Sequence, residues 1–131
     1  MEPAEVDRWF REYLSTFASC GRGENEAAGL LAYYGVPLLV STDEGFVALT
    51  TGDEVAAMAQ RQVAGMRAAE YDHSDVLDFE LSLLNTVTAL CRGNFSRRHR
   101  DGTEIGRLTA TYLVTGTPDS RRISALAVHS P

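Results

Sequence analysis

The sequence predicts an α+β domain in which three helices come first and a strongly curved antiparallel sheet follows. In the first half of the chain, apolar residues recur every three or four positions, as they do on one face of a helix. From residue 75 onward, apolar and polar residues alternate, as in half-buried strands. The chain has 131 residues, of which 44% are hydrophobic, and this is the size of one domain with one core. We therefore treat residues 1–131 as a single domain.

Two helices are expected before the first strand. The first, over about residues 3–20, has the clearest apolar stripe in the chain, formed by Val6, Trp9, Phe10, Tyr13, Leu14 and Phe17. The second is expected over about residues 25–34. Gly35 and Pro37 follow it, and both residue types commonly end helices.

A short hairpin is expected next, with strands over residues 38–41 and 46–50. Thr51 and Glu54 have the spacing of a capping box, in which each side chain accepts a hydrogen bond from the other residue's backbone N–H. This pair predicts the start of a third helix over residues 52–68.

Four longer strands complete the chain as a meander, over about residues 75–83, 87–96, 105–115 and 122–129. Their alternation assigns one set of side chains to the inner face, namely Leu77, Phe79, Leu81, Ala89, Cys91, Gly93, Leu108, Ala110, Tyr112, Ala125 and Ala127. Many of these residues are small, so we expect a cavity beneath the first helix. The alternative is that this helix packs closely on the sheet and fills the space.

Charge and cysteine content limit the partners that we expect. Twelve Lys and Arg against 18 Asp and Glu give a net charge of -6, which disfavours nucleic acid as a partner. No apolar run is long enough to span a membrane, and the acidic start does not resemble a signal peptide. Cys20 and Cys91 have no metal-ligand spacing, so we expect buried free thiols in a cytoplasmic protein that needs no metal or cofactor.

Few side chains are candidates for chemistry. Asp78 and Glu80 alternate with buried residues, so they are assigned to the outer face, in ion pairs with neighbouring arginines. His73 is interpreted as part of a polar connection, and residues 97–100, which include His99, as a solvated loop. His129 shares the assigned inner phase of the last strand and is the best candidate for a general base.

The order of elements resembles the nuclear-transport-factor-2-like superfamily, which includes ketosteroid isomerases and SnoaL-like polyketide cyclases. The likeness covers nearly the whole chain. Four features carry it: the first-helix stripe that ends at Phe17, Leu31-Ala32-Tyr33-Tyr34, Thr51-Gly52-Asp53-Glu54-Val55, and the final hairpin of Ala110-Thr111-Tyr112-Leu113-Val114 and Arg122-Ile123-Ser124-Ala125-Leu126. Relatives often enter the last strand with Gly-Trp-basic-aliphatic, whereas this chain has Ser120-Arg121-Arg122-Ile123.

This resemblance implies a cone-shaped, cystatin-like roll with a pocket that is open at one end, and a homodimer formed through the outer sheet face. Ketosteroid isomerases are a standard example of enzymes in which the surroundings shift the pKa of a carboxyl group. In them, a carboxylate base and a protonated acid act on the substrate. The base would fall among Leu38, Leu39 and Val40, and the acid at or beside Ala110. These side chains cannot transfer a proton, so isomerase chemistry is disfavoured.

The leading hypothesis is a dimeric domain that binds a small apolar or aromatic molecule. Its expected lining residues are Trp9, Tyr13, Phe17, Tyr34, Ala110, Tyr112 and His129. One alternative is a SnoaL-like isomerase or cyclase that acts through His129 and Tyr13. Another is a structural or regulatory dimer whose cavity is filled by its own side chains.

Overall fold

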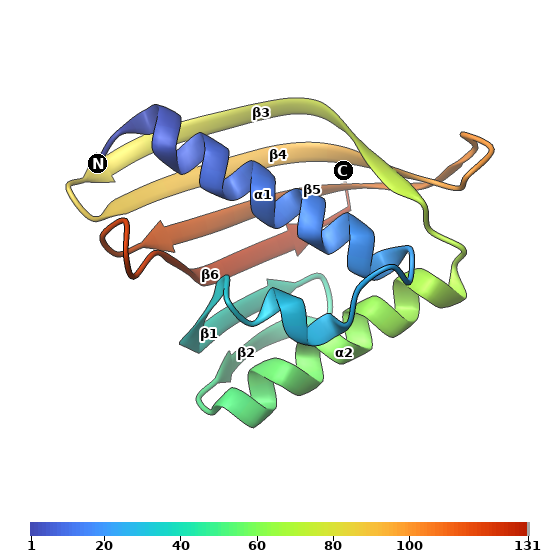
Figure 1. Cartoon of the computed structure of the whole chain (residues 1–131), viewed down its shortest axis with the longest axis horizontal. Helices are drawn as coiled ribbons and strands as arrows, with labels where there is room; N and C mark the ends of the chain where they lie inside the picture. The colour runs from blue at the N-terminus through green and yellow to red at the C-terminus, as the bar shows by residue number, and fades with distance from the viewer. Residues whose placement is uncertain (131) are drawn as a thin grey trace.

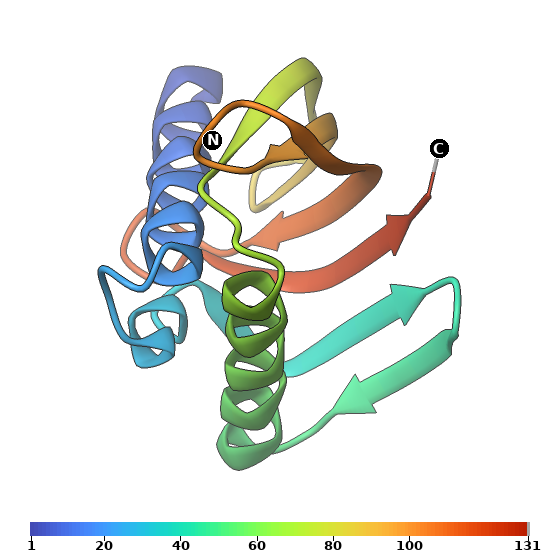
Figure 2. The same ribbon diagram turned by 90° about the vertical axis from the view of Figure 1, so that its right-hand side faces the viewer.

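The computed structural model, which describes residues 1–130, has two α-helices on the concave side of one six-stranded sheet (Figures 1 and 2). The elements in chain order are α1 (Pro3–Gly21), the 3-10 helix η1 (Ala27–Leu30), β1 (Tyr34–Thr42), β2 (Gly45–Leu49), α2 (Gly52–Ala68), β3 (His73–Asn85), β4 (Thr88–Arg98), β5 (Glu104–Thr115) and β6 (Arg122–His129). The predicted α+β class is confirmed. No helix within residues 1–130 is long and apolar enough to cross a membrane.

The sheet has the strand order β2-β1-β6-β5-β4-β3. The predicted hairpin (β1 and β2) and the predicted meander (β3 to β6) are both present, and each is antiparallel within itself. They join where β1 pairs with β6, and these two strands run parallel. The sheet is therefore mixed, and the prediction of a wholly antiparallel sheet is wrong at this junction.

The predicted second helix, over residues 25–34, is also wrong. Only the 3-10 turn Ala27–Leu30 forms there, and Tyr34 already belongs to β1, opposite Ile123 of β6. The backbone N–H of Ile123 donates to the carbonyl of Tyr33 at 2.7 Å. Pairing with a distant strand thus overrides a local helical pattern that is too short to be stable alone.

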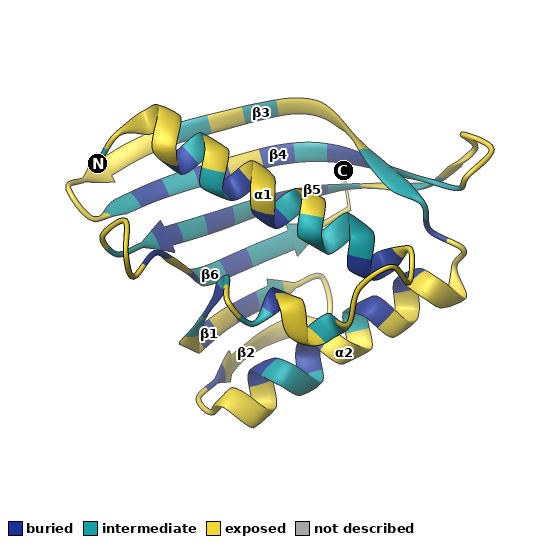
Figure 3. Cartoon of the chain, viewed as in Figure 1, coloured by how far each residue is buried: buried dark blue, intermediate teal, exposed yellow. Residues whose placement is uncertain are grey.

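The core lies between the helices and the concave face of the sheet, where the buried positions gather (Figure 3). Phe10 of α1 is fully buried, and its ring centroid lies 4.9 Å from that of Tyr112 and 5.5 Å from that of Phe79. At the sheet centre, the space above Gly93 is taken by the ring of Phe95, which a Cβ at position 93 would meet at 2.6 Å. Aromatic side chains therefore fill much of the space that the small inner residues leave.

The predicted capping box of α2 is confirmed. The hydroxyl of Thr51 accepts from the backbone N–H of Glu54 at 3.2 Å, and the Glu54 carboxylate accepts from the backbone N–H of Thr51 at 3.1 Å. Two of the four N–H groups at the helix start are thereby satisfied without help from the rest of the fold. This fixes where α2 begins, and so which of its side chains reach the sheet.

A bulge at Ser124 changes which residues of β6 face the helices. Leu113 lies opposite Ala125 and Val114 lies opposite Ile123, so Ser124 is the extra residue. Beyond the bulge, Leu126 and Val128 share the inner face with Tyr112 and Ala110, whereas Ala125, Ala127 and His129 face outward. The predicted inner phase of β6 is wrong because one unpaired residue inverts the alternation.

A second irregularity moves Leu77 of β3. Val76 pairs with Phe95 and Asp78 with Asn94, which leaves Leu77 unpaired and 45% exposed. Leu77 is therefore not an inner residue as predicted. Phe79 and Leu81 remain on the inner side, opposite Gly93 and Cys91.

Candidate functional site

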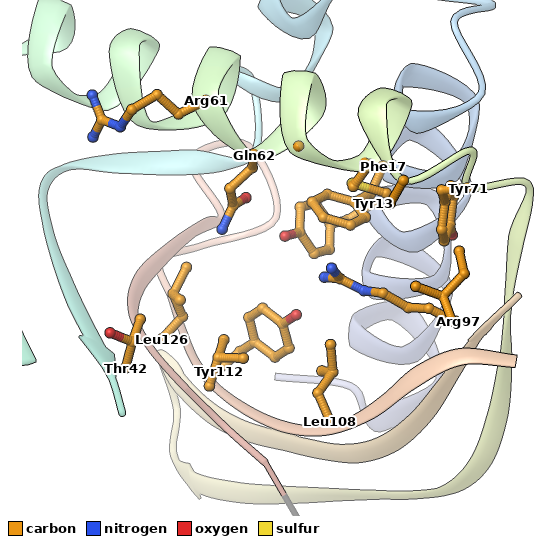
Figure 4. A pocket seen from close by; sticks show the side chains of 15 residues that line it. Tyr13, Phe17, Thr42, Arg61, Gln62, Tyr71, Arg97, Leu108, Tyr112 and Leu126 are labelled. Carbon is orange, nitrogen blue, oxygen red and sulfur yellow. The ribbon is translucent and has the colours of Figure 1, made fainter. Parts of the chain in front are cut away.

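A cavity of about 300 Å³ lies between the two helices and one end of the sheet (Figure 4). α1 and α2 form one side, and the end of β4, the start of β5 and the end of β6 form the other. It is lined by Tyr13, Phe17, Thr42, Arg61, Gln62, Gly65, Met66, Ala69, Tyr71, Arg97, Ile105, Leu108, Tyr112, Leu126 and Val128. Its volume is at the lower end of the range typical of small-molecule sites.

A second space of about 210 Å³ adjoins the first beneath α1. Five residues line both: Phe17, Tyr71, Arg97, Leu108 and Tyr112. The remaining lining of the second space is Leu14, Ser15, Ala18, His73, Ser74, Val76 and Phe95. Arg97 therefore stands at the boundary of two largely apolar compartments.

Buried tyrosine hydroxyls form the inner wall of the cavity. The hydroxyls of Tyr13 and Tyr34 are hydrogen-bonded at 2.9 Å, and the ring of Tyr112 lies 5.8 Å from that of Tyr13. Burial raises the pKa of Tyr112 to about 12 and raises the pKa values of Tyr13 and Tyr34 well above the ordinary value for tyrosine. These groups stay protonated near neutral pH, so they can donate hydrogen bonds but cannot act as bases.

Two stronger polar groups reach into the same space. Figure 4 shows the guanidinium of Arg97, from the end of β4, extending between Tyr13 and Tyr112, and the amide of Gln62, from α2, entering the same space beside Tyr13. The Arg97 guanidinium carbon lies 5.8 Å from the ring centroid of Phe17, a cation–π geometry. Within residues 1–130, Arg97 has neither an ion pair nor a side-chain hydrogen bond. The side-chain oxygen of Gln62 is buried and also lacks a partner there.

The structure brings three of the expected lining residues together at the cavity: Tyr13, Phe17 and Tyr112. Tyr34 lies behind them, bonded to Tyr13. Trp9 packs edge-on against Tyr33, with ring centroids 5.4 Å apart, and lines neither space.

The remaining expected site residues also lie outside the cavity wall. Ala110 is fully buried but does not line either space. His129 is exposed on the outer side of β6, where its Nδ1 lies 2.9 Å from the carbonyl of Ser130. The expectation that His129 lies at the cavity mouth, near Tyr13, is therefore wrong, for the same reason as the phase of β6.

The other two histidines lie beside polar groups, and His73 is the first residue of β3 rather than part of a connection before it. Nδ1 of His73 lies 2.8 Å from the Asp72 carboxylate, and Nε2 lies 3.7 Å from that of Asp75. Nδ1 of His99 lies 3.1 Å from the carbonyl of Glu70. Only Nδ1 of His73 is thus within hydrogen-bond distance of a carboxylate, and the residue borders the smaller space.

The outer-face carboxylates follow the prediction in position but only partly in partner. Asp78 accepts two hydrogen bonds from the Asn94 amide, at 2.8 and 2.9 Å. Glu80 lies opposite Arg92 in the β3–β4 register, without a direct ion pair between them in the described chain. Arg107 pairs instead with Glu104, at 2.9 Å.

Arg97 is the site residue that the sequence interpretation missed. The run Arg97-Arg98-His99-Arg100 suggested a solvated loop, but β4 continues to Arg98. The alternation of Cys91, Gly93 and Phe95 on the inner face, extended by one step, places Arg97 there. The alternation therefore indicates the inner position of Arg97, although the charged run beside the hairpin turn is also typical of a loop.

The lining permits binding more readily than proton transfer. None of the 15 residues around the larger space has a carboxyl, imidazole or thiol group. Leu38 and Val40, at the expected position of an isomerase base, are buried aliphatic residues of β1. Among the described residues, no three His, Cys, Asp or Glu side chains are placed to hold a metal ion.

Comparisons with solved structures show the fold. An NTF2-like protein of unknown function from Shewanella oneidensis MR-1 is 14% identical, with 99% of this chain and 100% of that chain covered, at a TM-score of 0.72. A protein of unknown function with a cystatin-like fold from Nostoc punctiforme PCC 73102 is 12% identical, with coverages of 100% and 96% and a TM-score of 0.73. A ketosteroid isomerase-like protein from Erwinia carotovora atroseptica SCRI1043 is 14% identical, with coverages of 99% and 98% and a TM-score of 0.70.

The family follows from the sequence itself. The chain has no match among curated proteins. A family model described as NTF2-like protein (DUF6841) matches residues 4–131, which is nearly the whole chain. The cone of helices on a curved sheet and the structural neighbours agree with that match. The chain therefore belongs to the NTF2-like family DUF6841, as the resemblance predicted.

Proposed function

We propose that this domain binds a small, mainly apolar molecule in the cavity between α1, α2 and the sheet. The supporting observation is the open volume of about 300 Å³, walled by aromatic and aliphatic side chains with a few polar groups that converge on it. The buried aromatic cluster behind it, from Phe10 to Tyr13 and Tyr112, supplies a rigid wall. Rigid walls favour binding because little ordering is needed when a ligand enters.

The isomerase or cyclase alternative has less support. Proton transfer needs a group whose pKa lies near the working pH and which reaches the substrate. The tyrosine pKa values are raised by burial, and His129, the favoured base, is on the opposite side of the sheet. A catalytic role in this cavity would therefore have to rest on hydrogen-bond donation from Tyr13 or Tyr112 alone.

Native mass spectrometry of freshly purified protein tests the binding proposal, because a retained ligand appears as added mass. A hydrophobic dye that fluoresces in apolar sites gives a second readout for protein that has lost its ligand. Leu108→Trp should fill the cavity, since Leu108 lines both spaces, and should abolish both signals. Leu84→Trp, at an exposed position near the end of β3 that lines neither space, is the matched control.

The outcomes separate the three hypotheses. Added mass or dye binding that is lost only in Leu108→Trp supports the cavity as the site. If wild-type protein neither retains a ligand nor binds the dye, the binding proposal fails. That result would favour the alternative in which the protein's own side chains fill the cavity. Turnover of a retained compound by the wild type, with its loss in Tyr13→Phe, would favour an enzyme.

We also propose that the domain is a homodimer that assembles through the outer sheet face. This face presents Leu39 of β1, Ala125 of β6 and Leu113 of β5 in register with one another, and Phe46 of β2 lies opposite Ser41, two residues along β1 from Leu39. Phe46 is 68% exposed and Leu39 is 40% exposed, and a second copy of the same face would cover both.

The two buried free thiols support the expectation of a reducing, cytoplasmic setting.

A further inference from the structure

Two arginines line the cavity, and Arg97, the one that extends between Tyr13 and Tyr112, differs from its neighbours on the sheet. Arg98 donates to the Asp75 carboxylate at 2.7 Å, and Arg107 donates to that of Glu104 at 2.9 Å. Arg97, between them at the inner end of β4, has no such partner within residues 1–130. Its side chain is half-buried and turns toward the cavity rather than toward the carboxylates (Figure 4).

The cavity offers the guanidinium little compensation. No carboxylate lines either space, and the carboxylates of Asp72 and Asp75 are engaged with His73 and Arg98. The face of Phe17 contributes a cation–π contact at 5.8 Å. Within residues 1–130 the half-buried guanidinium has no carboxylate partner, so it is available to pair with an anion that enters the cavity.

A second polar side chain without a complete set of partners, Gln62, borders the same space. The oxygen of the Gln62 side chain is buried and has no donor in residues 1–130. The other end of the amide faces the cavity, beside Tyr13 in Figure 4. Either orientation of the amide leaves one polar group there. Arg61, one residue earlier on α2, extends away from these groups in the same view. Arg97 and Gln62 thus define a polar end of a cavity whose other walls are Leu108, Leu126 and Val128.

We infer that the ligand is a small organic acid, whose carboxylate pairs with Arg97 and whose apolar or aromatic body occupies the space lined by Leu108, Leu126 and Val128. A guanidinium presents two parallel N–H groups that match the two oxygens of a carboxylate. The end of the Gln62 amide that faces the cavity supplies a second hydrogen-bonding group for a polar substituent on the ligand. The net charge of the chain is -6, which repels anions at long range. The attraction for a carboxylate therefore comes from Arg97 itself. This inference rests on the proposed binding function.

The test compares ligands that have the same shape and differ in charge. Benzoate and 2-naphthoate are titrated against the wild type, followed by protein NMR chemical shifts, beside the neutral isosteres benzamide and 2-naphthamide. We expect each acid to bind at least about tenfold more tightly than its amide, because a bidentate, charge-assisted pair is stronger than a neutral hydrogen bond. Raising the salt concentration should weaken the binding of the acids and leave the binding of the amides unchanged.

Two variants locate the charge. Arg97→Met keeps the aliphatic stem and should remove the preference for the acids while the amides still bind, and Arg97→Lys should retain part of it. Arg100→Met is the matched control, because Arg100 is exposed in the β4–β5 hairpin and lines neither of the two spaces. If Arg97→Met does not fold, the wild-type comparison and the lysine variant still decide the question.

The results distinguish the two proposals. Equal binding of acids and amides to the wild type overturns the carboxylate inference and leaves the binding function standing. A preference that survives in Arg97→Met overturns the role of Arg97. Failure of all four probes to bind in the cavity counts against the binding function itself.

Discussion

At the scale of single residues, the cavity depends on tyrosines that are kept neutral by burial. Their folded-state pKa values are raised above the value in the unfolded chain, which is near 10.0. Between the two values the folded protein binds more protons than the unfolded one, so stability falls as pH rises. The contribution is fully present below pH 10 and is lost as pH rises through the folded pKa, which is about 12 for Tyr112.

Tyr112→Phe should therefore flatten the alkaline decline of stability. The free energy of unfolding, measured with urea from pH 8 to 11, should fall less steeply above pH 10 in this variant than in the wild type. Tyrosinate absorbance during a pH titration gives an independent readout of the delayed ionisation. Identical slopes above pH 10 would show that Tyr112 ionises equally in both states.

Arg121 presents the opposite problem, a buried charge that the fold does not satisfy. Its side chain is 4% exposed, and its Nε and Nη2 have no hydrogen-bond partner in residues 1–130. It stands where relatives often have tryptophan. Each buried donor without a partner costs about 1–3 kcal/mol.

Arg121→Met should thus raise the free energy of unfolding, by about 1 kcal/mol, because it keeps the packed stem and removes the charge. Arg122→Met, the neighbouring exposed arginine, should change it by less than about 0.5 kcal/mol. Urea unfolding of the three proteins under one set of conditions makes the comparison. A destabilised Arg121→Met would mean that the guanidinium has a counterpart, such as a bound water or a second chain.

At the scale of elements, helices with complete local signals could be predicted and elements set by distant partners could not. The stripe of α1 and the capping box of α2 act within a few residues, so their positions follow from the sequence. The segment before Tyr34 has a helical pattern, but its hydrogen bonds go to β6. No local feature of that segment reports this pairing.

The candidate site was predicted in part for the same reason. Tyr13, Phe17 and Tyr112 lie on regular elements, and their faces follow from period alone. His129 was misplaced because the bulge at Ser124 depends on how β6 fits against β5, which alternation does not reveal. Arg97 could have been found, because the regular alternation of β4 reaches it without a break.

The capping box offers a prediction at this scale. Thr51→Ala should lower the free energy of unfolding by about 1 kcal/mol, because one N–H group at the start of α2 loses its acceptor. Thr86→Ala, at an exposed turn between β3 and β4, is the control and should have little effect. Equal stability of the two variants in thermal or urea unfolding would mean that packing alone holds the start of α2.

At the scale of the whole molecule, the proposed dimer can be tested on the exposed end of the outer face. Phe46→Asp places a charge on the edge strand of the surface that two copies would bury, and should give a monomer with an unchanged circular dichroism spectrum. Val87→Asp introduces the same charge at the distant β3–β4 turn and should leave the dimer intact. Light scattering after size-exclusion chromatography measures the masses. A monomeric wild type would end the dimer proposal.

The parallel pairing of β1 with β6 also constrains the order in which the chain can assemble. Residues 34–42 emerge from the ribosome long before residues 122–129, yet they are neighbours in the sheet. Until then, the β1–β2 hairpin has no strand to dock on, and β5 has an open edge. A nascent chain halted before Arg122 would therefore be two unconnected pieces of sheet, and the cavity wall formed by Leu126 and Val128 would close last.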